Sequence, residues 1–307
     1  MKIAILGATS QIAKDLILSF SRKKSYYFLL YGRDVEVLEK WTKDENLSER
    51  HCVENYSNFG NNQTYDVIIN FVGIGDPAEA QRMGSSIFKV TEKYDDMALD
   101  YVKHHKKTKY FFLSSGAVYG GKYKEPVNED TVATININHL CATDWYTISK
   151  LYAEAKHRSL SNLPIVDIRV FNYFSHTQDM NARFLITDLV RAIKNKKVFK
   201  TSSDNIIRDF ITPPDFYNLI QLIIDFKEIN IAIDCYTRYP ISKFDLLSEF
   251  ESKFGLSYEI DKSADIISAT GVKLNYYSVN KILKNMGYMP KNTSLEGILQ
   301  EVDSLGL

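Results

Sequence analysis

The sequence predicts an α/β fold built on a doubly wound parallel sheet, and two of its features carry that prediction. Short runs that are apolar throughout alternate with longer stretches that have helical spacing. Strands without a polar face are buried on both sides, as in a parallel sheet that helices cover on each face. Alternation of strands and helices is typical of doubly wound sheets. The predicted strands are residues 2–7, 26–33, 65–73, 109–115 and 164–172.

Helices are predicted between these strands, and a smaller unit is predicted after them. The stretches with helical spacing are residues 11–23, 34–44, 85–105 and the segment that begins at Tyr146. After residue 173 the pattern is mixed, and Pro213 with Pro214 predicts a turn before a helix over residues 215–225. Residues from about 241 to the end have the pattern of a smaller α/β unit.

Composition and charge exclude several classes of protein. The chain has 307 residues, of which 45% are hydrophobic, enough for a large core. Basic and acidic residues balance at 38 each, so no overall field attracts a nucleic acid polymer or a membrane surface. The apolar runs fall short of the ~18 residues that a membrane span needs. Cys52, Cys141 and Cys235 lie far apart without metal-ligand spacing, which indicates reduced thiols, a cytoplasmic location and no metal site.

The turn after the first strand, GATSQIA over residues 7–13, has the character of a dinucleotide-binding turn. Such a turn needs little side chain where the backbone meets a pyrophosphate, and a helix N-terminus that points at the anion. Gly7 suits the tight turn, and Ala13 replaces the last glycine of the usual pattern without harm to helix packing. Ser10 replaces the middle glycine, but it is small and its hydroxyl can bond a phosphate. A strand–turn–helix unit that binds no ligand is the alternative.

This turn predicts a Rossmann-type dinucleotide-binding domain over residues 1–172, to which residues 213–240 return. Residues 173–212 and 241–307 are expected to form a smaller C-terminal α/β substrate-binding cap. In open α/β sheets the ligand lies at the carboxyl ends of the strands, so the site is expected at that edge.

The end of the second strand bears on the choice of cofactor. NAD enzymes usually place a carboxylate there to hold the ribose hydroxyls, but here the position is Gly32, followed by Arg33. A guanidinium suits the 2′-phosphate of NADP. A solvated Arg33 is the alternative, and Asp34 becomes the ribose ligand if the strand ends two residues later.

Tyr146 and Lys150 are four residues apart on a predicted helix and therefore share one face. A phenol has a pKa near ~10, too high for a base at neutral pH. A nearby ammonium favours the phenolate, so we expect Lys150 to lower the pKa of Tyr146. Ser115 ends a predicted strand at the carboxyl edge of the sheet, where its hydroxyl is placed to donate to an oxygen that Tyr146 also protonates.

Together these residues resemble the extended short-chain dehydrogenase/reductase family, which contains nucleotide-sugar epimerases, dehydratases and ketoreductases. LSSGAVYG (113–120) followed by YTISK (146–150) is the most specific part of the resemblance. The opening strand and turn, IRVFNYF (168–174) and RDFITPPD (208–215) extend it over nearly the whole chain.

The resemblance implies a role for each matching residue. Tyr146 is implied as the acid or base, Lys150 as the residue that holds the cofactor ribose, and Ser115 as the residue that orients the substrate oxygen. Asn172 and Arg208 are implied to contact the substrate phosphates. The implied cofactor-binding residues are Gly7, Thr9, Ser10, Gln11, Ile12, Arg33, Phe71, Val72, Gly73, Lys150 and Phe171. The family also implies a homodimer that pairs through the helices over residues 85–105 and 146–160.

The resemblance leaves the reaction open between two outcomes. The family's 4,6-dehydratases carry an acidic pair after the catalytic hydroxyl, and Gly116 with Ala117 replaces it here, which disfavours dehydration. Hydride transfer at carbon 4 of a nucleotide-activated sugar remains, either as reduction of a 4-keto sugar by NADPH or as 4-epimerisation with retained NAD. Arg33 favours NADP and the reductase. A non-catalytic dinucleotide sensor is a further alternative, which the intact Tyr146, Lys150 and Ser115 disfavour.

Overall fold

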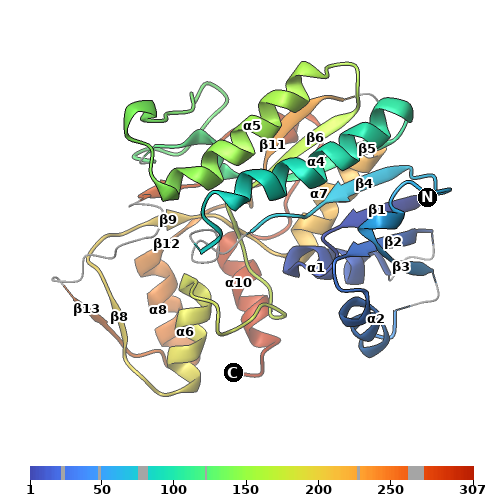
Figure 1. The fold of residues 1–307 in the computed structure, drawn as a ribbon. Helices are drawn as coiled ribbons and strands as arrows, with labels where there is room; N and C mark the ends of the chain where they lie inside the picture. The colour runs from blue at the N-terminus through green and yellow to red at the C-terminus, as the bar shows by residue number, and fades with distance from the viewer. Residues whose placement is uncertain (22–24, 48–49, 75–81, 122, 227–228, 262–272) are drawn as a thin grey trace.

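The chain folds around a seven-stranded parallel sheet with helices on both faces (Figure 1), as the sequence predicts. The computed structural model describes residues 1–21, 25–47, 50–74, 82–121, 123–226, 229–261 and 273–307. The sheet has the strand order β11-β6-β5-β4-β1-β2-β3. Its strands are β1 (Lys2–Leu6), β2 (Tyr27–Gly32), β3 (His51–Asn55), β4 (Val67–Asn70), β5 (Lys109–Ser115), β6 (Ile165–Val170) and β11 (Ile231–Asp234).

Alternate residues of the strands pack against different helices. Ile3 and Ile5 of β1 belong to a core cluster with helix α1 (Gln11–Ser21) and helix α7 (Pro213–Asp225). Ala4 and Leu6 belong to a second cluster with helix α4 (Ser86–His104) and helix α5 (Trp145–Ser159). Successive side chains of a strand point to opposite faces, so each face of the sheet is covered by its own helices. Helix α2 (Val35–Asp44) follows β2.

Several boundaries differ from the sequence-based prediction. The expected strand over 164–172 breaks at Phe171, because β6 ends at Val170 and the next two residues form β7 (Asn172–Tyr173) in a different sheet. The prediction that Pro213 and Pro214 form a turn before the helix is wrong, since both belong to the first turn of α7. Proline fits there because the first helical N–H groups have no partner within the helix. The expected helix over 11–23 runs into residues 22–24, which lie outside the described residues.

The segments after residue 171 build a second, smaller unit with its own core cluster. Its strands form small sheets, with β9 between β12 and β14, β10 beside β7, and β13 beside β8. Figure 1 shows α6, α8 and α10 side by side below the ends of the large sheet. Its strands are β8 (Phe199–Thr201), β9 (Ile207–Arg208), β10 (Phe210–Ile211), β12 (Ile241–Ser242), β13 (Tyr258–Ile260) and β14 (Asn275–Tyr276). Its helices are α6 (Leu185–Lys194), α8 (Lys243–Phe254) and α10 (Ser294–Asp303). The short helix α9 (Ile282–Asn285) packs with the large sheet instead, as α7 and β11 do, because Leu283 belongs to the core cluster of α1 and α7.

Candidate active site

The glycine turn after β1 packs directly against the end of β4. Gly7 has a φ of +74°, which favours glycine, and a Cβ atom there would lie 2.9 Å from the backbone nitrogen of Val72. The same atom would lie 3.0 Å from the carbonyl carbon of Phe71. The turn therefore brings together three residues that the sequence assigns to cofactor binding. The backbone nitrogen of Gly7 also donates to the phenol of Tyr56 over 3.0 Å, a contact that the sequence does not predict.

The side chains at the start of α1 differ from one another in the contacts that they make. The hydroxyl of Ser10 accepts from the backbone nitrogen of Ala13 over 3.4 Å, so it satisfies an N–H group of the first helical turn. Thr9 is exposed, whereas Ile12, in the first turn of α1, packs against the core cluster that α1 shares with β1 and α7. The side-chain amide of Gln11 donates to Thr177, which lies in the segment after β7. Gln11 therefore contacts the smaller unit in this structure.

The end of β2 falls at Gly32, where the sequence places it. A Cβ atom on Gly32 would lie 3.7 Å from the methyl group of Thr9, so this strand end lies beside the glycine turn. Asp34 caps α2, because its carboxylate accepts from the backbone nitrogen of Val37 over 3.0 Å. The cap uses one oxygen of Asp34, the alternative ribose ligand, and leaves the other oxygen able to accept. Arg33 is exposed beside the same edge of the sheet.

Tyr146 and Ser115 meet at the carboxyl edge of the sheet, as the sequence predicts. Ser115 ends β5 and Tyr146 lies in the first turn of α5, so that the Ser115 hydroxyl is near enough to the Tyr146 phenol to affect its pKa. Burial raises the pKa of the Tyr146 phenol, and the Ser115 hydroxyl lowers it by less. The expectation that the environment lowers this pKa is therefore wrong for the structure described, because burial outweighs the favourable contact.

Lys150 lies one helical turn further along and points under the end of the sheet. Its ammonium donates to the carbonyl of Leu113 over 2.7 Å and lies 6.0 Å from the centre of the Tyr146 ring. Burial lowers the pKa of Lys150 to about 8. A Cβ atom on Gly73 would lie 3.2 Å from this ammonium, so the glycine leaves room for it. Lys150 thus stands between the acid–base pair and the predicted cofactor edge.

A third hydroxyl, which the sequence analysis missed, reaches the same serine. The phenol oxygen of Tyr276 lies 3.2 Å from the hydroxyl oxygen of Ser115. Tyr276 lies on β14, a strand of two residues in the smaller unit. A strand of two residues is too short to give a periodic pattern, so the sequence did not indicate that Tyr276 lies near Ser115.

Gly116 and Phe171 show why the segment after Ser115 has no acidic side chain. A Cβ atom on Gly116 would stand 2.3 Å from the ring of Phe171. The ring is buried, so it has no room to move away. Any side chain at position 116 would therefore collide with it, and a dehydratase carboxylate has no space there. Phe171, which was assigned to the cofactor, also packs against Tyr276 with ring centres 5.1 Å apart.

Two cations lie in the smaller unit on the far side of Tyr276. The carbon of the Arg208 guanidinium is 5.8 Å from the centre of the Tyr276 ring, and the ammonium of Lys273 is 4.3 Å from it. Burial lowers the pKa of Arg208 to about 10, and burial together with Arg208 lowers that of Lys273 to about 8. No carboxylate of the described residues pairs with either cation. Two neighbouring half-buried cations without an acidic partner among the described residues are suited to an anionic ligand.

Asn172 lies between the segments that carry Arg208 and Tyr276, and its side chain contacts both of them. Its side-chain amide donates to the carbonyl of Asp209 over 3.2 Å and to the carbonyl of Tyr276 over 3.4 Å. The residue therefore ties β7 to the strands that carry Arg208 and Tyr276. The sequence places Asn172 at the substrate phosphates, and these contacts locate it beside Arg208.

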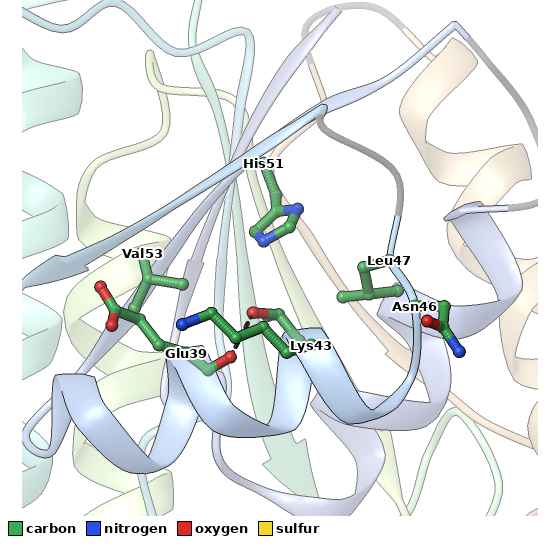
Figure 2. Close-up of a pocket in the computed structure, with 7 residues that line it drawn as sticks. Glu39, Lys43, Asn46, Leu47, His51 and Val53 are labelled. Atoms are coloured by element: carbon green, nitrogen blue, oxygen red, sulfur yellow. Dashed lines mark hydrogen bonds between the residues drawn. The ribbon is translucent and has the colours of Figure 1, made fainter.

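A separate hollow of about 500 Å³ lies between α2 and β3 (Figure 2). His51 and Val53, which face it, belong to the first half of β3, so the hollow does not open at the carboxyl edge of the sheet. The other lining residues are Glu39, Thr42, Lys43, Asn46 and Leu47. None of the residues assigned to cofactor or substrate lines it.

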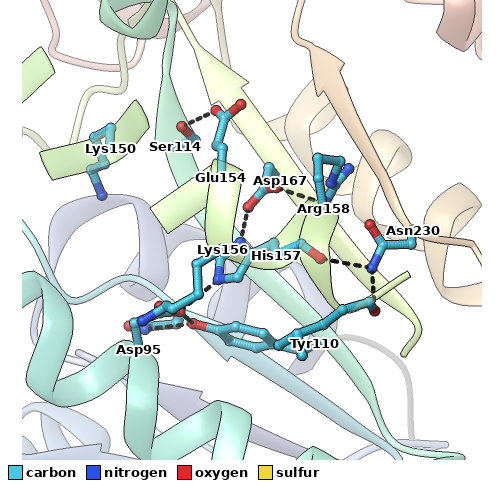
Figure 3. A network of polar contacts seen from close by, with 12 residues as sticks. Asp95, Tyr110, Ser114, Lys150, Glu154, Lys156, His157, Arg158, Asp167 and Asn230 are labelled. Atoms are coloured by element: carbon cyan, nitrogen blue, oxygen red, sulfur yellow. Dashed lines mark hydrogen bonds and ion pairs between the residues drawn. The ribbon is translucent and has the colours of Figure 1, made fainter. Parts of the chain in front are cut away.

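A network of buried polar contacts lies behind Lys150, between α4, α5 and β6 (Figure 3). Its centre is His157, whose ring nitrogens lie 2.8 Å from Asp95 and 2.6 Å from Asp167. The phenol of Tyr110 donates to Asp95 over 2.8 Å and accepts from Asn70 at the end of β4. The network therefore fixes the end of a cofactor-facing strand to the helix that carries the acid–base pair.

These observations define a class of protein. A parallel sheet in this order, with helices on both faces and a glycine turn after the first strand, is a Rossmann-like fold. The chain belongs to the NAD dependent epimerase/dehydratase family, whose model matches residues 3–232. No curated protein matches the sequence. Among the described residues, no helix has the length and apolar character needed to cross a membrane.

Solved structures with this fold match over almost their entire length. A UDP-glucuronic acid 4-epimerase from Bacillus cereus, in complex with a substrate analogue and NAD, matches with a TM-score of 0.80 and 18% identity over 100% of this chain and 99% of that chain. A UDP-glucose 4-epimerase from Bifidobacterium longum with NAD+ and UDP gives 0.77 and 19%, over 100% of both chains. A dTDP-glucose 4,6-dehydratase from Bacillus anthracis with NAD gives 0.77 and 16%, over 99% and 96%.

Proposed function

We propose that the protein catalyses NAD(P)-dependent hydride transfer at carbon 4 of a nucleotide-activated sugar. The observation that carries this proposal is the contact between Tyr146 and Ser115 at the carboxyl edge of the sheet, with Lys150 one helical turn away. A bound nicotinamide would accept or supply the hydride. Tyr146 would hold or release the proton at the 4-oxygen, and Ser115 would donate a hydrogen bond to the same oxygen.

The remaining roles are proposed on the same basis. Residues 1–172 and 213–240 would bind the cofactor, and residues 173–212 and 241–307 would form the substrate cap. The proposed cofactor contacts run from the glycine turn, through Arg33 and residues 71–73, to Lys150 and Phe171. Arg208 and Asn172 would contact the diphosphate, which the unpaired cations beside Tyr276 support. The clash that any side chain at Gly116 would make with Phe171 supports a reaction other than dehydration.

Two outcomes of the hydride transfer have separate support. The family description and the NAD recorded in the similar structures support 4-epimerisation with retained NAD. Gly32 and Arg33 support NADPH and reduction of a 4-keto sugar, since no carboxylate stands at the strand end to repel a 2′-phosphate.

Turnover assays on the purified protein test the proposal. The protein would be denatured and the released cofactor identified by mass spectrometry, and the native protein would be incubated with UDP-glucose or UDP-glucuronate and the products followed by NMR. Retained NAD with a product inverted at carbon 4 indicates the epimerase. Oxidation of added NADPH by a 4-keto sugar nucleotide indicates the reductase. Binding of cofactor and nucleotide sugar without any turnover would support the sensor and contradict the proposal.

The cofactor preference depends on Arg33. We expect Arg33→Ala to weaken NADPH binding about ten- to a hundredfold and leave NADH binding nearly unchanged, because a charge-assisted contact to a phosphate is worth roughly 1.5–3 kcal/mol. Fluorescence titration of both reduced cofactors measures this. Lys40→Ala, which removes an exposed charge from α2, is the control. Equal losses for both cofactors, or a wild type that prefers NADH, would favour NAD and the epimerase.

We also propose a homodimer that pairs through α4 and α5. A hollow of about 260 Å³ lies between these helices, and Phe88 and Tyr152 are among its lining residues. Tyr152 is 52% exposed, whereas Ile87 and Leu99 of α4 are buried in the core and are not available to a partner. We expect a dimeric mass by light scattering at micromolar concentration, and a monomeric mass for Tyr152→Glu. Val37→Glu, at an exposed apolar residue of α2, should remain dimeric.

A further inference from the structure

Tyr276 connects the smaller unit to the catalytic serine. It lies on β14, which pairs with β9 so that Tyr276 is the partner of Arg208. Its phenol crosses to the large sheet and ends 3.2 Å from the hydroxyl oxygen of Ser115. Among the described residues, Ser115 is the one side chain to which this phenol hydrogen-bonds. The tyrosine has no part in the proton transfer described above, although it touches a residue that does.

The hydrogen-bonding capacity of Ser115 shows what this contact does. A serine hydroxyl has one donor and two acceptor positions. The backbone nitrogen of Ala117 donates to the hydroxyl over 3.2 Å and fills one acceptor position. Burial raises the pKa of Tyr276, so its phenol keeps its proton at neutral pH and has that proton to donate. When the Tyr276 phenol donates to the second acceptor position, the Ser115 hydroxyl can bind a further partner only by donating its proton.

We propose that Tyr276 is a positioning residue, whose phenol donates to Ser115 and thereby directs the Ser115 proton toward Tyr146 and the substrate oxygen. This inference rests on the proposed function. It makes the orientation of the serine depend on a residue of the substrate-binding unit. Tyr276 is also the strand partner of Arg208. A substrate bound at Arg208 therefore contacts the same pair of short strands, β9 and β14, that positions the Ser115 hydroxyl.

The packing around Tyr276 holds the phenol in place. Its ring makes an edge contact with Tyr123, with ring centres 4.9 Å apart, and packs against Phe171 on another side. The ammonium of Lys273 lies 4.3 Å from the ring centre. The residue is only 8% exposed. These contacts fix the ring independently of the hydroxyl, so removing the hydroxyl alone should leave the ring where it is.

A double-mutant cycle between Tyr276→Phe and Ser115→Ala tests the inference. We expect Tyr276→Phe to lower kcat about five- to tenfold, the effect of losing one hydrogen bond, with little change in KM for the nucleotide sugar or in the Kd of the cofactor. In the Ser115→Ala background the same substitution should cost no further activity, because the residue acts through the serine. Far-UV circular dichroism and thermal unfolding would establish that each variant is folded.

The matched control is Tyr123→Phe. Tyr123 is a buried neighbour whose phenol donates to the carbonyl of Gly116 over 2.6 Å and not to Ser115. Its effect should be the same factor with or without Ser115. A Tyr276→Phe enzyme with wild-type kcat, or losses that multiply in the double variant, would overturn the inference while the proposed function stands. A wild type without turnover on any nucleotide sugar would overturn the proposed function and the inference with it.

Discussion

Replacing Tyr146 with phenylalanine is expected to remove nearly all turnover, by ~100- to 10,000-fold, and to leave the fold and cofactor binding intact. The substitution deletes the hydroxyl that we propose carries the proton at the 4-oxygen, and it keeps the ring. Tyr146 is held in position by its helix, which Lys150 and the network behind it fix to the sheet. The loss should therefore appear in kcat, with the Kd of the cofactor unchanged.

The measurement is kcat on the substrate identified by product analysis, together with a cofactor titration of each variant. Tyr27→Phe, at a partly exposed tyrosine at the start of β2, is the control and should keep full activity. A Tyr146→Phe enzyme that retains wild-type rates would show that another group carries the proton. Tyr276 would then be the first candidate, since its phenol shares Ser115.

The raised pKa of Tyr146 has a consequence for the direction of catalysis. A protonated phenol is ready to act as an acid, which is the role that reduction of a 4-keto sugar requires first. Oxidation of a sugar hydroxyl requires the phenolate instead. The protein offers Lys150 for that state, and a positively charged nicotinamide would favour the phenolate further. An epimerase must use both states in turn, so its acid–base pair needs the nearby cation more than a reductase does.

The positions of Ser115, Tyr146 and Lys150 at one edge of the sheet could be predicted from the sequence because they lie at ends of elements whose periodicity is strong. Ser115 ends an apolar strand, and Tyr146 and Lys150 share a helix face, so the topology of a parallel sheet brings them to one edge. Strand β3 was missed because its residues, HCVEN, do not form an apolar run and the strand lies at the edge of the sheet. Tyr276 was missed because its position depends on how the smaller unit docks, which local sequence patterns do not encode.

The sequence also did not predict how burial and neighbouring charges combine to set the pKa of a buried group. The spacing of Tyr146 and Lys150 predicts that Lys150 lowers the pKa of Tyr146, but burial, which depends on tertiary packing, raises it. Sequence likewise gave no reason to single out His157, which is one of several polar residues on a helix with polar residues around much of its surface. Its role becomes visible only when α4, α5 and β6 are assembled.

Replacing His157 with glutamine is expected to lower the free energy of unfolding by about 3 kcal/mol or more. The ring is fully buried between Asp95 and Asp167, and both ring nitrogens face carboxylate oxygens, an arrangement that requires two donors and hence the charged ring. Glutamine has no charge, so two buried carboxylates would lose the cation between them. Removing one member of a buried ion pair typically costs about 3–5 kcal/mol. Asp95 keeps Lys156 at 2.6 Å and Asp167 keeps Arg158 at 2.8 Å, so we expect the lower end of this range.

The pH dependence of this contribution has a definite sign. Burial alone lowers the pKa of His157, but hydrogen bonds to Asp167 and Asp95 outweigh it and raise the pKa to about 9. Since the folded-state pKa lies above the ordinary value of ~6.5, the stabilisation is fully present below that value and is lost as the pH rises through about 9. The difference in unfolding free energy between wild type and His157→Gln should therefore be largest near pH 6 and shrink toward pH 9.

Urea unfolding at pH 6, 7.5 and 9 measures this difference, with Lys103→Met as the control. Lys103 pairs with Asp100 over 3.0 Å on the exposed surface of α4, so its loss should cost at most about 0.5 kcal/mol. Because Asn70, Tyr110 and Asp95 connect His157 to the end of β4, the glutamine variant should also bind the cofactor less tightly under conditions where it remains folded. A difference that stays constant across this pH range would mean that the cluster takes up no extra proton on folding and that His157 is neutral in the folded protein.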